Sequence, residues 1–168
     1  ATYEREKAEF EKEKAAGAPV RADISKLEAG QMVVIEWRGK PVYVLRRTQK
    51  QIDELPTVES HLKDPTSASA DQPEYIEGVA RAIRPEILVL VGLCTHLGCA
   101  PKHRPEVGVP DLGGDAWVGG FFCPCHGSRF DLSGRVYNGS PASTNLVVPP
   151  YSYEGDNVLV VGVDQGAA

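Results

Sequence analysis

Six side chains that could bind a metal or an electron carrier lie in two short segments of the 168-residue chain. Residues 94–99 read Cys-Thr-His-Leu-Gly-Cys, and residues 123–128 read Cys-Pro-Cys-His-Gly-Ser. Each segment supplies two cysteines and one histidine, so thiolate and imidazole ligands occur together. Gly98 and Gly127 stand beside these residues, where glycine permits tight loops and lets backbone N–H groups approach a sulfur atom. The two segments therefore predict a site built from two loops.

Simple interpretations leave some of these residues unexplained. Disulfide bonds alone would use the four cysteines but would give the two histidines no role. A zinc site would take four of the six ligands, typically from cysteines two residues apart, and would leave two cysteines without a purpose. A Rieske [2Fe–2S] centre would use all six, because two cysteines hold one iron, two histidines hold the other, and a disulfide joins the remaining cysteines.

Composition excludes several other classes. The chain has 18 basic and 23 acidic residues and a net charge of −5, with no basic run, so nucleic-acid binding is not expected. The longest unbroken apolar run is only 87–91, far short of the roughly 20 residues that span a bilayer. No signal peptide is visible, and the chain begins at Ala1 rather than Met, so we expect a processed or truncated chain that is soluble as given.

The surrounding elements predict an antiparallel β domain. The abundance of glycine (17) and proline (13) favours turns and short strands over a helical bundle. A short helix is expected over 48–55 with Thr48 as N-cap, followed by a long surface loop over 56–73 and an irregular, cysteine-containing stretch over 94–143. A charged helix is expected over 3–16. Strands are expected over 32–37, 42–45, 86–91, 146–148, 151–153 and 157–163.

The two cysteine–histidine segments resemble the cluster-binding boxes of the Rieske iron–sulfur subunit of cytochrome bc complexes, in its proteobacterial type. The resemblance covers about residues 17–164 and implies an all-β fold, a Rieske-type antiparallel β-sandwich with an inserted, loop-built cluster-binding subdomain and a short N-terminal helix. Further similar segments are residues 17–27, 37–42, 46–48 and 71–75.

The same resemblance implies a domain organisation. It divides the Rieske domain, residues 17–168, into a base fold (17–92 and 145–168) and a cluster-binding subdomain (93–144). Family members carry a transmembrane helix near residues 1–16, which the resemblance does not cover. We therefore interpret this charged segment as the remnant or replacement of a membrane anchor or tether.

Site residues follow from the resemblance one position at a time. Cys94 and Cys123 would bind the inner iron of one [2Fe–2S] cluster, and His96 and His126 would bind the outer iron through neutral imidazoles. Cys99 and Cys125 would form a disulfide, which implies an oxidising compartment such as the periplasm.

Residues beside the ligands would tune the cluster or contact a partner. Ser128 resembles the serine that donates to a bridging sulfide. Phe130 stands where many members place a tyrosine that donates to a ligand sulfur, and its alternative role is packing. Leu97 would belong to the docking face or form a lid over the cluster, and Pro141 would lie on the docking face. Residues 140–143 read Ser-Pro-Ala-Ser, where the family usually has Gly-Pro-Ala-Pro. Gly98 and Gly127 complete the tuning set.

The function implied is electron transfer in ubiquinol–cytochrome c reductase, respiratory complex III, a translocase in which this subunit is not active alone. It would take one electron from ubiquinol at the quinol-oxidation site of cytochrome b, with a proton accepted by His126 or His96, and pass the electron to a c-type cytochrome. The location implied is the periplasmic face of the bacterial inner membrane, with an anchor that this chain lacks.

Three alternatives remain open at this stage. One is the Rieske small subunit of another periplasmic oxidoreductase, of the arsenite oxidase type. Another is a soluble Rieske ferredoxin or the Rieske domain of an aromatic-ring dioxygenase, which usually lack the second cysteine pair. The third is a zinc-stabilised binding module, which would be colourless.

Overall fold

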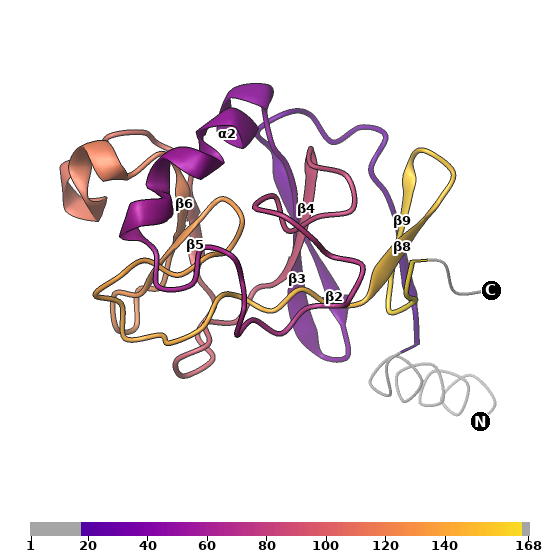
Figure 1. Ribbon diagram of the computed structural model, residues 1–168. Coiled ribbons are helices and arrows are strands. Elements are labelled where there is room, and N and C mark those ends of the chain that lie inside the picture. Colours follow the sequence, from indigo (N-terminus) through magenta and orange to yellow (C-terminus); the bar gives the residue numbers. More distant parts are fainter. Residues whose placement is uncertain (1–17, 166–168) are drawn as a thin grey trace.

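The computed structural model describes residues 18–165, and the charged helix predicted over 3–16 lies outside this range. Within this range, nine short strands form three antiparallel sheets of three strands, which lie side by side in Figure 1 and confirm the all-β prediction. The sheet orders are β1-β9-β8, β2-β3-β4 and β5-β6-β7. Their bounds are β1 Val20–Asp23, β2 Met32–Trp37, β3 Lys40–Arg46, β4 Ile87–Val91, β5 Lys102–Arg104, β6 Gly120–Phe122, β7 Arg129–Asp131, β8 Tyr151–Glu154 and β9 Val158–Val161.

The middle sheet carries the centre of the core. All five residues of β4 are buried, as expected for a continuous run of Ile, Leu and Val between two packed faces. β4 pairs with β3 in a register that sets Val44 opposite Val89. β2 and β3 form the predicted hairpin, whose turn residues Arg38 and Gly39 both have positive φ, 54° and 72°. Two such residues match the right-handed twist of the flanking strands.

Helices cover little of the chain. Helix α2 (Gln49–Glu54) begins where it was predicted, because the Thr48 hydroxyl accepts from the Gln51 N–H and the Gln51 side chain accepts from the Thr48 N–H. A 3₁₀ helix, η1 (Leu55–His61), follows directly. Two further 3₁₀ turns, η2 (Pro110–Leu112) and η3 (Gly114–Ala116), lie between β5 and β6. Among residues 18–165 no helix is long and apolar enough to cross a bilayer.

Two sequence predictions are wrong in part. The expected surface loop over 56–73 starts as η1, because Val58 and Leu62 are buried against Trp117 and Tyr137. The strand expected over 146–148 does not form, although Val147 accepts a hydrogen bond from the Val91 N–H.

The stretch 94–143, expected to be irregular, contains a complete small sheet. Strands β5, β6 and β7 have three residues each and pair in the order β5-β6-β7. All three lie inside the segment 93–144, so they agree with the predicted cluster-binding subdomain, whose bounds stay a prediction. Phe121 and Phe130 of this sheet share one buried cluster with Val44 and Leu88 of the middle sheet. A continuous core therefore joins the two sheets.

A buried polar network lies in the turn after β7. The Asp131 carboxylate pairs with the Arg135 guanidinium at 2.7 Å and accepts hydrogen bonds from the backbone N–H groups of Ser133 and Arg135. Arg47 donates to Leu132 O and Ser133 Oγ, both at 2.9 Å. The three charged side chains, those of Arg47, Asp131 and Arg135, are almost completely buried. Their hydrogen bonds and ion pair in this turn are therefore shielded from water.

Arg81, which is distant from this turn in the sequence, also binds it. Its guanidinium donates to the carbonyls of Ser133 (3.0 Å) and Leu146 (2.7 Å). Burial lowers the pKa of Arg47 and of Arg81 to about 10 each, with the charge of Asp131 opposing the shift. Both guanidinium groups therefore stay charged at neutral pH.

This network predicts a strong dependence of stability on Asp131. Replacing it by asparagine (Asp131→Asn) removes the buried counter-charge of Arg135 and leaves only the partly exposed Glu59 carboxylate, 3.7 Å away, so we expect the free energy of unfolding to fall by about 3–5 kcal/mol. Urea denaturation at pH 7 measures the change. The matched control is Glu154→Gln, which removes the partner of Arg21 in an exposed ion pair and should have a far smaller effect. Equal effects of the two substitutions would contradict the role of the network.

Candidate metal centre

The two ligand segments fold into loops with the same backbone hydrogen bonds. In the first, Cys94 N–H donates to Cys99 O at 2.7 Å, and Gly98 N–H donates to Cys94 O at 2.9 Å. Gly98 has φ = 81° and Gly127 has φ = 82°, a left-handed conformation that strains any residue with a side chain. The second loop repeats both bonds, Cys123 N–H to Ser128 O at 2.8 Å and Gly127 N–H to Cys123 O at 2.9 Å.

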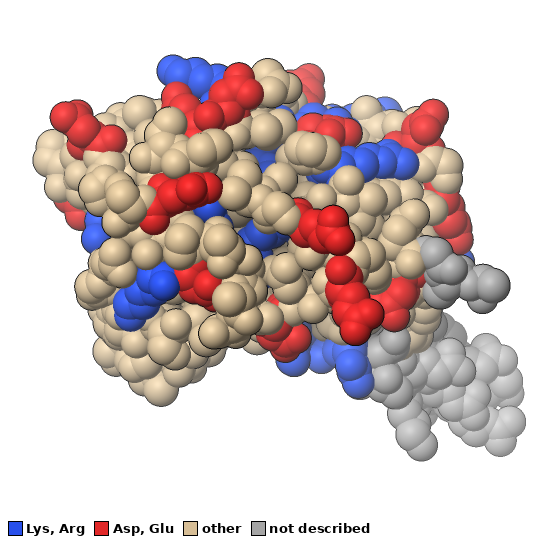
Figure 2. Space-filling view, viewed as in Figure 1, with Lys and Arg blue, Asp and Glu red and all other residues tan. Residues whose placement is uncertain are grey.

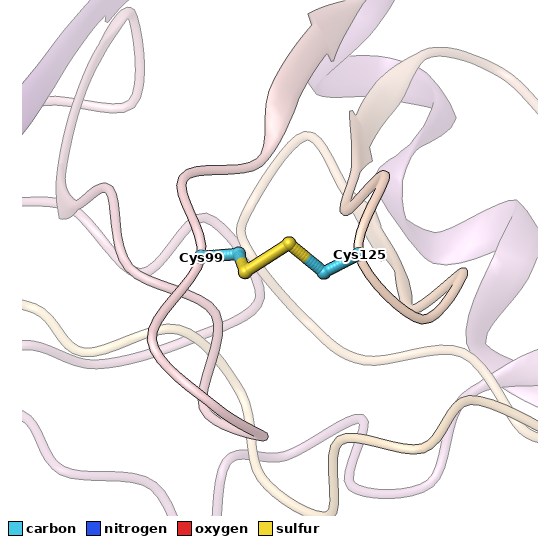
Figure 3. The surroundings of a disulfide bond; sticks show 2 residues. All are labelled: Cys99 and Cys125. Atoms are coloured by element: carbon cyan, nitrogen blue, oxygen red, sulfur yellow. A yellow bond between two sulfur atoms is a disulfide. The ribbon is translucent and has the colours of Figure 1, made fainter.

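A disulfide joins the two loops. Cys99 of the first loop and Cys125 of the second are bonded at 2.08 Å, with their Cα atoms 6.5 Å apart, and Figure 3 shows the bridge between the two chain segments. The pairing implied by the family resemblance is thereby confirmed. The bond removes both sulfurs from the set of possible thiolate ligands.

The other two cysteines are free and lie together beneath the loops. Cys94 is 4% exposed and Cys123 is 2% exposed. The Cys123 sulfur lies within 4.8 Å of both disulfide sulfurs. Burial raises the pKa of the Cys123 thiol, hydrogen bonding with the Cys94 thiol raises it further, and the backbone N–H groups of Cys125 and His126 oppose the shift. A bound metal ion would supply the positive charge that stabilises these two thiolates.

Two histidines face solvent above the thiols. His96 and His126 are exposed, and their ring centroids are 4.9 Å apart with an angle of 89° between the planes. Two buried thiols and two adjacent imidazoles, drawn one each from the two loops, match the donor set that a Rieske [2Fe–2S] cluster requires. These four residues fit that group, and the oxidised Cys99 and Cys125 do not compete for it.

Two of the predicted tuning residues are buried: Ser128 ends the second ligand loop, and Phe130 lies on β7. Ser128 is buried, and its Oγ accepts from the Ala142 N–H at 3.0 Å, which leaves its own O–H available as a donor. Phe130 is fully buried on β7 opposite Phe121 and shares a cluster with the ligand cysteines, so it packs as well as standing at the tuning position.

The loop segments around the candidate ligands carry no charged residues of their own. Residues 94–101, 123–128 and 138–146 contain no Lys, Arg, Asp or Glu. In Figure 2 the lower left part of the surface is almost entirely free of charged side chains, whereas both signs alternate over the rest of the face shown. Leu97 is 67% exposed there and Pro141 is also exposed. This exposure favours the contact-surface interpretation of Leu97 over a lid.

Sequence reasoning missed two residues that support the loops. The Tyr43 hydroxyl, buried on β3, donates to Pro101 O at 2.6 Å, two residues beyond the disulfide. Burial raises the pKa of Tyr43, and the nearby Cys123 adds to the shift. The one sign of this packing in the sequence is the glycine at position 92. A Cβ atom at Gly92 would lie 2.2 Å from the Tyr43 ring, so only glycine fits beside that ring. The second missed residue is Lys63, whose ammonium group donates to two carbonyls of the 140–143 loop.

Comparisons with known proteins agree with this geometry. The family model described as "Rieske [2Fe-2S] domain" matches residues 19–152. A ubiquinol-cytochrome c reductase iron-sulfur subunit of Allochromatium vinosum is 53% identical over 155 residues, 92% of this chain and 74% of that protein. One from Bradyrhizobium diazoefficiens is 41% identical over 148 residues, 88% of this chain and 74% of that protein.

A solved structure, "Hyperthermophilic respiratory Complex III", resembles the chain with a TM-score of 0.51 at 24% identity, over 94% of this chain and 92% of that one. At this level of identity the match shows a shared fold.

The disulfide yields a stability prediction. It closes a loop with a sequence separation of 26, so replacing both cysteines by alanine (Cys99→Ala with Cys125→Ala) should lower the free energy of unfolding by about 3–4 kcal/mol on the chain-entropy model. Denaturation of the oxidised wild type and the double variant measures the difference. Dithiothreitol should destabilise the wild type and leave the variant unchanged, and equal sensitivity of the two proteins would contradict the prediction.

Proposed function

The chain belongs to the Rieske [2Fe–2S] domain family, and we propose that it is the electron-transfer subunit of a bacterial ubiquinol–cytochrome c reductase. In this role it takes one electron from ubiquinol at cytochrome b and passes it to a c-type cytochrome. The carrying observation is the pair of exposed histidines, 4.9 Å apart, above two buried free cysteines in disulfide-linked loops. The 53% identity to a subunit of that name supports the same assignment.

Four residues would hold the cluster: Cys94, Cys123, His96 and His126. When bound, the cluster supplies a one-electron centre whose potential is raised because two neutral imidazoles replace two thiolates. The buried thiol pair holds the inner side, shielded from water. The exposed imidazole pair forms the outer side, where a substrate can reach it.

The histidines also supply the proton chemistry that quinol oxidation needs. A quinol loses a proton together with each electron, and an exposed ring nitrogen of His96 or His126 can accept the hydrogen bond of its hydroxyl group and then the proton. Both rings stand on loops that the disulfide and the repeated backbone bonds hold fixed. These constraints keep the acceptor nitrogens in one orientation.

The surroundings of the histidines fit docking on an apolar pocket. Exposed Leu97 and Pro141 lie in loop segments that contain no charged residue, so little charge of these segments needs to be desolvated when they enter a partner. The disulfide further supports a location on the periplasmic face of the bacterial inner membrane, because such bonds persist in oxidising compartments.

The cluster's midpoint potential, measured by voltammetry against pH, tests this proposal. We expect a potential well above that of four-cysteine clusters. It should fall as the pH rises above neutrality, because the reduced state retains a ring proton that the oxidised state releases. A low potential that does not change with pH would instead indicate a ferredoxin. A colourless, EPR-silent protein carrying zinc would exclude the iron–sulfur assignment altogether.

Phe130→Tyr should raise the midpoint potential. Phe130 is buried in the same core as Cys94 and Cys123, and by the family resemblance a hydroxyl at this position would donate to a ligand sulfur. A hydrogen bond to a charged group is worth about 1.5–3 kcal/mol. At about 59 mV per 1.4 kcal/mol for one electron, the rise is at most on the order of 60–130 mV. The matched control is Phe121→Tyr, on the neighbouring strand. The tuning role would be contradicted if Phe130→Tyr did not raise the midpoint potential, or raised it no more than Phe121→Tyr does.

A further inference from the structure

The loop formed by residues 140–143 is held against the second ligand loop by side chains from elsewhere in the chain. The Ala142 N–H donates to Ser128 Oγ at 3.0 Å. On the other side of the loop, Lys63 Nζ donates to Ser140 O and, at 2.8 Å, to Ala142 O. We propose that Lys63 is a positioning residue that fixes this loop, and with it Pro141, for docking on the quinol-oxidising partner. The docking role rests on the function proposed above, whereas the clamp itself does not.

Lys63 can act as a clamp because its own backbone is fixed. Its N–H donates to Val136 O at 3.0 Å, and its neighbour Leu62 forms a β-bridge with Tyr137. The Asn138 N–H donates to His61 O at 2.8 Å, so residues 61–63 run as a short antiparallel partner of 136–138. The backbone of Lys63 is therefore already ordered by these contacts. Binding the 140–143 loop costs only the conformational entropy of the lysine side chain.

The segment after Lys63 is equally constrained. The Asp64 carboxylate accepts from the N–H groups of Ala68 and Ser69, at 2.8 and 2.9 Å. The Asn145 amide donates to Asp64 O and Ser67 Oγ, both at 3.0 Å. Residues 61–69 thus form a scaffold attached to the chain on both sides of the 140–143 loop.

Such a clamp matters here because Pro141 is the only residue of the loop whose φ is fixed by its own ring. Position 143 is serine, so the chain lacks the fixed φ that a proline would give there. The lysine supplies two charge-assisted hydrogen bonds, each stronger than a neutral one. Ser140 adds a local link, since its Oγ accepts from the Arg129 N–H at 3.0 Å. The Lys63 ammonium group and the Ser140 hydroxyl together restrain the loop, as a stiffer backbone would otherwise do.

Amide hydrogen exchange of the folded chain tests the clamp directly. Lys63→Met keeps the apolar stem and removes the three N–H donors, so exchange at the Ala142 amide should accelerate about tenfold or more, while the midpoint of urea unfolding changes little. Lys63→Arg, which restores a cationic donor, should recover most of the protection. Lys50→Met on α2, whose lysine lies 3.9 Å from Glu54 in an exposed pair, should leave Ala142 unaffected. Unchanged exchange in Lys63→Met would overturn the proposal.

Kinetics of the assembled reductase test the docking role. In Lys63→Met we expect KM for ubiquinol to rise several-fold, with a smaller effect on kcat, an unchanged EPR spectrum, and recovery in Lys63→Arg. Faster exchange with unchanged KM would refute the docking role and leave the proposed function intact. A chain without quinol-linked electron transfer would refute the proposed function, while the exchange experiment would still decide the clamp. If Lys63→Met does not fold, Lys63→Gln serves in its place and should show a smaller acceleration at Ala142.

Discussion

Burial of three guanidinium groups around one carboxylate is the constraint on which the irregular half of this molecule depends. Arg47, Arg81 and Arg135 are almost fully buried with Asp131, so three positive charges share one buried carboxylate, and the partly exposed Glu59 adds a second ion pair to Arg135 at 3.7 Å. Backbone carbonyls supply further stabilisation, because the arginines donate to eight of them, from residues that are far apart in the sequence. Each bond is expensive to lose, since it would leave a charge or a carbonyl unpaired away from water.

The network reaches the metal centre through backbone it holds in place. Arg135 donates to the carbonyls of Leu55 and Pro65, which fixes the two ends of the segment that presents Lys63. Lys63 then reaches Ser140 and Ala142. The polar interior is therefore linked to the 140–143 loop by hydrogen bonds at both ends of residues 55–65, of which η1 forms the first part. The links at each end are side chains that donate to backbone carbonyls.

Much of the fold could be predicted from the sequence where apolar residues run continuously. Strand β4 and the β2–β3 hairpin were expected because Val, Ile and Leu dominate them and glycine marks the turn. Strands β5 to β7 could not be predicted, because three residues are too few to show a period, and they form only by pairing with one another. The paired cysteines came from the motif alone, whereas the role of Lys63 depends on contacts 77 and 79 residues away, which no local pattern reveals.

The polarity of the site explains why its ligands divide as they do. Cys94 and Cys123 are buried against the core, where an unpaired thiolate would be costly, so their negative charge belongs beside bound metal. His96 and His126 are exposed, where a neutral ring can exchange a proton with an incoming molecule without crossing the protein. Each loop contributes one buried cysteine and one exposed histidine. By joining the two loops, the disulfide fixes the cysteine pair relative to the histidine pair. In the proposed function, the buried thiols would hold the cluster away from water, and the exposed imidazoles would accept the proton at the surface.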